Sequence, residues 1–202
     1  GVPPFANPAT PTGYVTAACV RLMIDSGILP QGSLQLISGS ARDLLDHLDY
    51  RDHVAFTGSA NTAATLRAHR NVIEGGIQFS AEADSLNAAI LGTDVTADSP
   101  EFEAFVKAVF GEMTSKAGQK CTAIRRAIVP HALVDATIDT LSTRLRDKVV
   151  VGDPRDANAT MGPLVSAEQK EDVAEAVEKL KAGGGEVVYG GEAVSYTHLR
   201  AH

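Results

Sequence analysis

The alternation of strand-like and helix-like segments constrains the fold of this chain most. Short apolar segments, which favour strands, alternate with longer segments whose apolar residues recur at helical spacing. Strands that alternate with helices indicate a parallel sheet with helical crossovers, because parallel neighbours need a long connection. The pattern predicts strands at 33–38, 53–57, 76–82, 87–91, 127–130 and 186–191, and helices at 12–26, 43–48, 59–69, 100–115, 134–149 and 166–182.

Size, charge and hydropathy exclude several classes of protein. With 202 residues, 44% of them hydrophobic, the chain can bury the core of one or two domains. Its formal net charge of −7 and the lack of a basic run argue against a nucleic acid partner. No apolar run approaches the ~18 residues of a membrane span, and nothing resembles a signal peptide. We therefore expect neither nucleic acid nor membrane as a partner.

The two cysteines stand in different surroundings. Cys19 shares helical spacing with Val15, Leu22 and Met23, so we expect it to lie in the core. Cys121 follows a polar Gly-Gln-Lys turn between a predicted helix and a predicted strand. Free cysteine usually packs as a small hydrophobic residue, so packing does not explain a thiol at this polar position. Two cysteines so far apart make no disulfide framework, which favours a reducing, cytoplasmic setting. Cys121 is the candidate nucleophile.

Three further residues lie where ligands bind in parallel sheets. Gly58 and Ser59 join a predicted strand to a helix, and the free N–H groups of a helix start suit a phosphate. An ordinary capping serine explains the same pair, since a dinucleotide fingerprint needs more glycines. Glu82 ends an apolar strand, where a carboxylate can act as a general base. A rim carboxylate paired with Lys or Arg is the alternative for Glu82.

The histidines give no comparable signal. A base for the Cys121 thiol could come from four of them, but none stands in a motif, so we interpret each as a surface or packing residue. We predict no metal site. The four are His47, His53, His69 and His131.

The order of these segments resembles the aldehyde dehydrogenase superfamily. The segments that carry the resemblance are "FTGSA", Glu82, "GQKC", "VGDPRD" and "MGPLV", and they cover nearly all of residues 1–192. "EADSLNAAILGTDV" and "KAGQKCTAIRRAIVP" resemble one branch, the dehydrogenase half of bifunctional ring-opening enzymes of phenylacetyl-CoA degradation, which pair an oxepin-CoA hydrolase with a semialdehyde dehydrogenase. The resemblance implies a truncated Rossmann-like cofactor-binding domain over 1–83 and a partial α/β catalytic domain over 84–192.

The chain ends fit an internal fragment. Gly1 is not an initiator methionine, and it opens an apolar, proline-containing stretch typical of the middle of a domain. The last ten residues, "AVSYTHLRAH", continue no periodicity and resemble a translated sequencing-library adapter. We therefore expect residues 193–202 to be a foreign, unpacked tail in which Tyr196 and Leu199 contact little.

The family resemblance also implies a mechanism. Cys121 attacks an aldehyde to form a thiohemiacetal, hydride passes to a nicotinamide, and Glu82 activates the water that hydrolyses the resulting thioester. The backbone N–H of Cys121 helps to hold the oxyanion. Gly58 and Ser59 meet the cofactor pyrophosphate, and Ala83 lies in the cofactor site. Small aldehydes are the implied substrates, and the full-length protein is implied to form a homo-oligomer.

A second motif of the family concerns the adenosine ribose. Asn7, Pro8 and Thr10 occupy its place, with Asn7 where lysine is usual and Thr10 where NAD-preferring members often carry glutamate. Losing that negative charge removes repulsion against a 2′-phosphate, so we predict NADP. NAD is the alternative, because Asn7 also removes a cation.

Three other functions compete with aldehyde oxidation to an acid. A CoA-acylating dehydrogenase would pass the acyl group to CoA, but such members often lack the base that Glu82 represents. A cysteine hydrolase or acyltransferase would need a histidine near Cys121 and gives no role to Gly58 and Ser59. A non-catalytic fragment or binding module is the third alternative.

Overall fold

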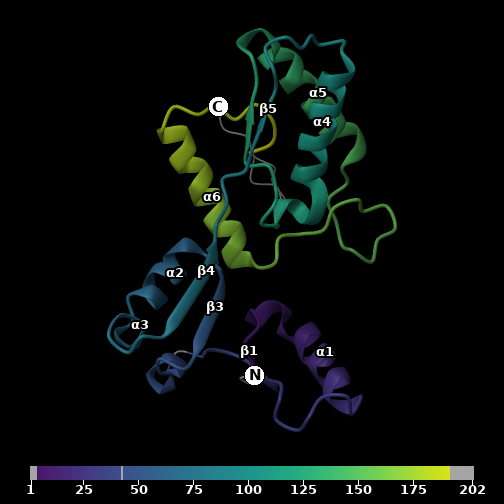
Figure 1. Cartoon of the computed structure of the whole chain (residues 1–202). Coiled ribbons are helices and arrows are strands. Elements are labelled where there is room, and N and C mark those ends of the chain that lie inside the picture. Colours follow the sequence, from purple (N-terminus) through teal and green to yellow (C-terminus); the bar gives the residue numbers. More distant parts are fainter. Residues whose placement is uncertain (1–3, 42, 192–202) are drawn as a thin grey trace. The chain divides into compact units, whose positions relative to one another are not determined.

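The computed structural model describes residues 4–41 and 43–191 (Figure 1). The chain divides into two compact units, with the boundary between Asp84 and Ser85. Helices and parallel strand pairs occur in both units, which confirms the predicted α/β class. The predicted tail at 193–202, with Tyr196 and Leu199, lies outside the described residues.

The first unit begins with a short parallel pair joined through a helix. β1 (Phe5–Ala6) pairs with β2 (Gln35–Leu36), and η1 (Thr10–Thr12) and α1 (Gly13–Asp25) connect them. The strand predicted at 33–38 is therefore only two residues long. The helix predicted at 43–48 is a single 3-10 turn, η2 (Leu44–His47).

A longer parallel pair follows in the same unit. β3 (His53–Gly58) and β4 (Gln78–Ala83) pair along six residues each, close to the predicted strands. Between them the chain forms α2 (Ala60–Arg67), which lies within the predicted helix at 59–69, and a short α3 (Arg70–Ile73) that was not predicted. His69 starts α3 by accepting a hydrogen bond from the Asn71 N–H.

The predicted burial of Cys19 is wrong. Cys19 is exposed, as are Val15, Leu22 and Met23 on the same helix, and Val20 is the buried residue of α1. These residues do lie on one helix, but burial also requires an element that packs on the apolar stripe. None of the residues described in the structure covers this stripe.

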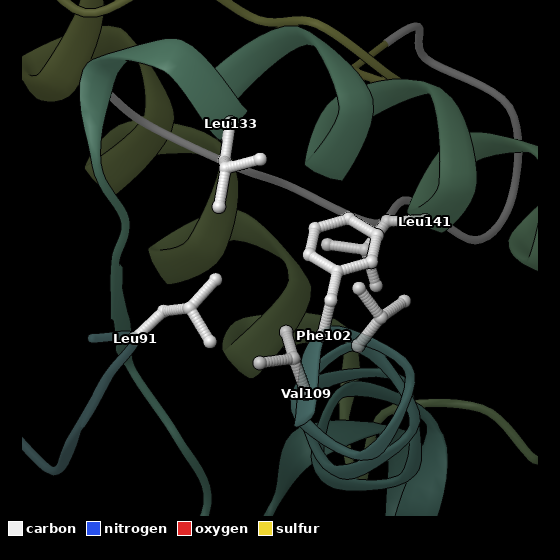
Figure 2. Packing of buried hydrophobic residues seen from close by; sticks show 6 residues of the cluster. Leu91, Phe102, Val109, Leu133 and Leu141 are labelled. Carbon is white, nitrogen blue, oxygen red and sulfur yellow. The ribbon is translucent and has the colours of Figure 1, made fainter. Parts of the chain in front are cut away.

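The second unit has a core between two long helices. α4 (Pro100–Thr114) and α5 (Val134–Lys148) pack side by side, and β5 (Ala88–Ile90) pairs in parallel with β6 (Arg126–Ile128) (Figure 1). Figure 2 shows the buried cluster that joins them. The apolar stripe of α4 lies on this cluster: Phe102, Val106 and Val109 are buried in it, and Phe105, Phe110 and Met113 pack against it. The cluster comprises Leu91, Phe102, Val106, Val109, Leu133 and Leu141.

The chain continues beyond this core into a turn region and a last helix. η4 (His131–Leu133) precedes α5. α6 (Ala167–Ala182) begins where the Ser166 hydroxyl accepts a hydrogen bond from the Gln169 N–H, and the sequence Ser166-Ala-Glu-Gln169 is typical of a capping box. The strand predicted at 186–191 is wrong, because these described residues pair with no other strand. A strand needs a neighbouring strand for its backbone hydrogen bonds, and the described residues provide none for this segment.

No helix of the described residues is long and apolar enough to cross a membrane.

Candidate active site

The turn before Cys121 has an unusual backbone. η3 (Ser115–Gly118) follows α4, and three successive residues in it have positive φ: Lys116 and Ala117 at 53° each and Gly118 at 71°. Glycine adopts this left-handed conformation freely, whereas for any other residue the conformation costs about 1–2 kcal/mol. Strained backbone of this kind persists only where surrounding contacts hold it, and it concentrates at functional sites.

Gln119 ties this turn to the Met-Gly-Pro segment. Its Oε1 accepts a hydrogen bond from the Val165 N–H at 2.8 Å, and its Nε2 donates to the carbonyl of Lys116 at 3.0 Å and more weakly to that of Pro163 at 3.4 Å. Two segments that the sequence analysis singled out are therefore in direct contact. The glutamine therefore holds the turn against this segment.

Asn87 and Arg125 hold the carbonyls on either side of Cys121. Asn87 Nδ2 donates to the carbonyl of Cys121 at 2.7 Å and to that of Ala123 at 3.1 Å. Arg125 donates to the carbonyls of Gly118 and Lys120, both at 3.0 Å. Sequence reasoning assigned neither residue a role; the only signal was an amide and a guanidinium in segments typical of the ring-opening branch.

The thiol itself is open to solvent. Cys121 is exposed, and its backbone N–H has no acceptor among residues 4–41 and 43–191. The neighbouring Lys120 is partly buried, and its ammonium pairs with Glu112 at 2.9 Å. Cys121 therefore carries an exposed thiol together with a backbone N–H that has no acceptor in the described residues, two groups that acyl-transfer chemistry can use.

Glu82 and Ala83 lie at the carboxyl end of β4, beside the end of β3. In the parallel register Thr57 pairs with Glu82, and Gly58 pairs with Ala83. The Glu82 side chain is exposed and forms no hydrogen bond or ion pair with the described residues. A carboxylate paired with Lys or Arg, the structural alternative for Glu82, is therefore not what the described part of the chain shows.

Gly58 and Ser59 lead from β3 into α2, as predicted. The Ser59 hydroxyl accepts a hydrogen bond from the Thr62 N–H at 3.2 Å, so Ser59 is an N-cap. Asp84 reaches the same helix end, where its Oδ2 accepts from the Ala60 N–H at 3.1 Å. The N–H groups of Ser59 and Asn61 have no acceptor in the described part of the chain.

The predicted ribose residues lie at the end of β1. Asn7 Nδ2 donates to the carbonyls of Ile37 and Gly39, both at 2.9 Å, so this amide fastens β1 to the loop after β2. Only Oδ1 of Asn7 is left to meet a ribose hydroxyl, as an acceptor. Pro8 follows, and Thr10 begins η1 with its side chain exposed.

The structure groups the predicted site residues by unit. Glu82, Ala83, Gly58 and Ser59 are brought together in the first unit, which also contains Asn7, Pro8 and Thr10. Cys121 belongs to the second unit, with Asn87 and Arg125.

Two of the histidines have structural partners. His53 Nε2 lies 3.0 Å from the Ser80 hydroxyl. His69 uses both ring nitrogens, because Nδ1 accepts from the Asn71 N–H and Nε2 lies 3.2 Å from Asp46 Oδ1. In the described residues no group of three or more His, Cys, Asp or Glu side chains could hold a metal ion.

The described residues thus form a parallel α/β fold with an exposed cysteine on a restrained turn. The model of the aldehyde dehydrogenase family matches residues 5–200. The chain belongs to this family, and the expectation from its motifs is confirmed.

Two curated relatives show how much of a family protein the chain represents. It is 46% identical to a 3,4-dehydroadipyl-CoA semialdehyde dehydrogenase from Aromatoleum evansii over 95% of this chain and 37% of that protein. It is 29% identical to a 1-pyrroline-5-carboxylate dehydrogenase from Staphylococcus aureus over 89% of this chain and 36% of that protein. The chain thus spans little more than a third of these relatives.

Solved structures show the same fold. A succinic semialdehyde dehydrogenase from Streptococcus pyogenes, in complex with NADP+, matches 98% of this chain with a TM-score of 0.84 at 24% identity. A betaine aldehyde dehydrogenase from Staphylococcus aureus, in complex with NAD+, matches 98% with a TM-score of 0.83 at 24% identity. The chain covers 43% and 40% of these two chains.

Proposed function

We propose that this chain is part of an enzyme that oxidises an aldehyde to a carboxylic acid, with Cys121 as the nucleophile and NAD(P) as the hydride acceptor. The observation that carries the proposal is the turn at Cys121 in a member of this family: the cysteine is exposed, and its backbone N–H has no acceptor among the described residues. In this proposal residues 1–83 contribute to the cofactor-binding domain, residues 84–192 to the catalytic domain, and residues 193–202 are foreign.

The chemistry follows from the groups on two residues. The thiolate of Cys121 attacks the carbonyl carbon, and the oxyanion that forms accepts a hydrogen bond from the N–H of Cys121. Once hydride has left the carbon, the acyl group is held as a thioester on Cys121. Glu82 takes a proton from the water that attacks this thioester, and the thiolate of Cys121 leaves.

The end of β3 and the start of α2 fit a nicotinamide dinucleotide, which would supply the acceptor for the hydride. The N–H groups of Ser59 and Asn61, which have no acceptor among residues 4–41 and 43–191, are donors suited to a pyrophosphate, and the helix dipole favours an anion there. That Asp84 places a carboxylate on the neighbouring Ala60 N–H supports the preference of this position for negative charge. Gly58, Ser59 and Ala83 would line the cofactor, and Asn7, Pro8 and Thr10 its adenosine end.

We assign NADP as the preferred cofactor, with NAD as the alternative. Thr10 places no carboxylate at the ribose, so a 2′-phosphate meets no repulsion from this position. Asn7 cannot act in place of a cation, because its amide is engaged by the carbonyls of Ile37 and Gly39.

A CoA-linked semialdehyde from aromatic catabolism is the proposed substrate. The support is the 46% identity to a relative described as a 3,4-dehydroadipyl-CoA semialdehyde dehydrogenase. A homo-oligomer in the cytoplasm is the assembly and location we propose for the full-length protein. Glu82 favours hydrolysis of the thioester over transfer to CoA, because its carboxylate has no competing partner in the described residues.

The test is a reduced-cofactor assay on a full-length protein that contains this chain. We expect absorbance at the wavelength of NADPH to rise with a CoA-linked semialdehyde and with no free CoA added. A rate that depends on free CoA would instead establish the CoA-acylating alternative. No reduced cofactor under either condition, with thioester or ester hydrolysis retained, would favour a cysteine hydrolase.

A further inference from the structure

The two peptide planes on either side of the Cys121 Cα are both held by side chains. The carbonyl of Lys120, in the preceding plane, accepts hydrogen bonds from Arg125 at 3.0 Å and from the Ala123 N–H at 3.3 Å. The carbonyl of Cys121, in the following plane, accepts from Asn87 at 2.7 Å. Rotation about both backbone bonds of Cys121 is therefore restrained.

Asn87 is itself anchored to the β5–β6 pair. Its carbonyl accepts hydrogen bonds from the N–H groups of Arg125 at 2.9 Å and of Arg126 at 3.1 Å. The next residue, Ala88, opens the parallel pairing with Arg126. Asn87 thus connects the strand pair to the turn, because its side-chain amide donates to the carbonyls of both Cys121 and Ala123.

Arg125 holds the other end of the turn. Its guanidinium donates through separate nitrogens to Gly118, the last of the left-handed residues, and to Lys120. A planar fork matches two carbonyls at once, which a lysine ammonium on a flexible stem does less well. One guanidinium therefore holds both the left-handed backbone at Gly118 and the carbonyl of Lys120.

These contacts determine where both reactive groups of Cys121 point. A trans peptide directs the N–H of Cys121 opposite to the carbonyl of Lys120, so this N–H points away from Arg125. That orientation leaves it without an acceptor in the described residues. With both planes held, the Cα–Cβ bond of Cys121 also has a fixed direction. Oxyanion donors work only when they are preorganised in this way.

We propose that Asn87 and Arg125 are positioning residues that orient the sulfur and the backbone N–H of Cys121 for attack on the aldehyde. The inference rests on the proposed function, in which Cys121 is the nucleophile. Neither residue touches the reacting atoms; each acts through the carbonyl it holds.

The decisive variant is Asn87→Asp in a full-length protein that contains this chain. Aspartate keeps the shape but puts an oxygen where the donor stood, so the carbonyls of Cys121 and Ala123 are repelled instead of held. We expect kcat to fall about 10²-fold, the effect of a misplacement of about 1 Å, with an unchanged Kd for the cofactor. Arg125→Lys keeps one donor and should lose less kcat than Arg125→Ala.

Asn71→Asp is the matched control. Asn71 Nδ2 also donates to backbone carbonyls, of Leu45 at 2.9 Å, Asp46 at 3.3 Å and Leu48 at 3.4 Å, but in the first unit. It should lower the free energy of unfolding as Asn87→Asp does and leave kcat nearly unchanged. Alkylation of Cys121 by iodoacetamide, which needs no fixed orientation, should change little in Asn87→Asp, with Cys19 as the internal reference.

The outcomes separate the two proposals. The positioning role is overturned if Asn87→Asp keeps its kcat, or loses no more than Asn71→Asp, while Cys121→Ala abolishes oxidation. The proposed function itself is overturned if Cys121→Ala still oxidises the aldehyde.

Discussion

Asp84 places its carboxylate at the amino terminus of α2, where Oδ2 accepts a hydrogen bond from the backbone N–H of Ala60 at 3.1 Å. Asp84 adopts positive φ, 43°, to reach this position. The pyrophosphate of a nicotinamide cofactor is proposed to bind at the same end of the helix. The aspartate therefore stabilises this helix end and opposes a second negative charge there.

Asp84→Asn should consequently have effects of opposite sign on stability and on cofactor binding. Asparagine tolerates the left-handed backbone and keeps an acceptor for Ala60, but it loses the charge. We expect the free energy of unfolding to fall by about 0.3–1 kcal/mol. We expect the Kd for NADP in a full-length protein to fall about five-fold, equivalent to ~1 kcal/mol of relieved repulsion.

Chemical denaturation and cofactor titration measure these two effects. Asp25→Asn removes the same charge at the end of α1 and should change neither quantity in this way. A weaker affinity for NADP in Asp84→Asn would show that the carboxylate does not oppose the pyrophosphate.

The two cysteines should differ in function although both are exposed. Cys121→Ala should abolish aldehyde oxidation in a full-length protein, because no other group can form the thiohemiacetal. Cys19→Ala should leave the rate unchanged, and since Cys19 is exposed it should change the free energy of unfolding by less than about 0.5 kcal/mol. Steady-state assays and urea unfolding test both. Inactivation by iodoacetamide through Cys19 alone would contradict the assignment.

Glu82→Gln should leave the first half of the reaction and slow the second. Glutamine keeps the shape of the side chain but cannot take a proton, so thioester hydrolysis should slow by roughly 10²–10⁴-fold. Rapid mixing should then show a burst of NADPH followed by slow turnover. If Glu82 also deprotonates Cys121, the burst itself will slow. Full steady-state activity in Glu82→Gln would exclude this carboxylate as the base.

The segments that sequence reasoning located well are those decided by local pattern. β3, β4 and α4 lie close to their predicted ranges, because an apolar strand between turns and a helical stripe of aromatic residues each specify one structure. The stripe of α4 also predicted the core, since a partner helix, α5, is present to cover it.

The misses concern properties that depend on a distant partner. The burial of Cys19 and the strand at 186–191 each needed a neighbouring element that the described residues do not supply. Asn87 looked like the polar start of a strand, and only the fold shows that its amide reaches the carbonyl of Cys121, 34 residues away. Left-handed backbone at Lys116 and Ala117 had no signal beyond the adjacent Gly118.

The ion pair between Glu103 of α4 and Arg144 of α5 should make the second unit sensitive to acid. The hydrogen bond from Arg144 lowers the pKa of Glu103, with smaller contributions from the charges of Arg144, Lys107 and Lys148. A carboxyl whose pKa is lower in the folded state stabilises the fold fully above its unfolded pKa, about 4.3, and loses that contribution as pH falls through the folded pKa.

Unfolding by urea as a function of pH tests this expectation. Below about pH 4.3 the wild-type chain should lose stability more steeply than Glu103→Gln, which has no charge to lose. Glu171→Gln is the control, because Glu171 on α6 forms no ion pair with the described residues. Parallel pH profiles of the wild type and Glu103→Gln would show that the ion pair does not contribute.

The left-handed backbone before Cys121 predicts an unusual response to glycine. Ala117 pays about 1–2 kcal/mol for its φ of 53°, and glycine adopts the same conformation without that cost. Glycine also gives the unfolded chain more freedom, which costs about 0.5–1 kcal/mol. Ala117→Gly should therefore raise the free energy of unfolding by about 0.5–1 kcal/mol.

Ala104→Gly is the control, at an exposed position inside α4, and it should lower the free energy of unfolding by about 1 kcal/mol. Urea unfolding of both variants measures the contrast, and a loss of stability in both would mean that residue 117 is not strained in solution.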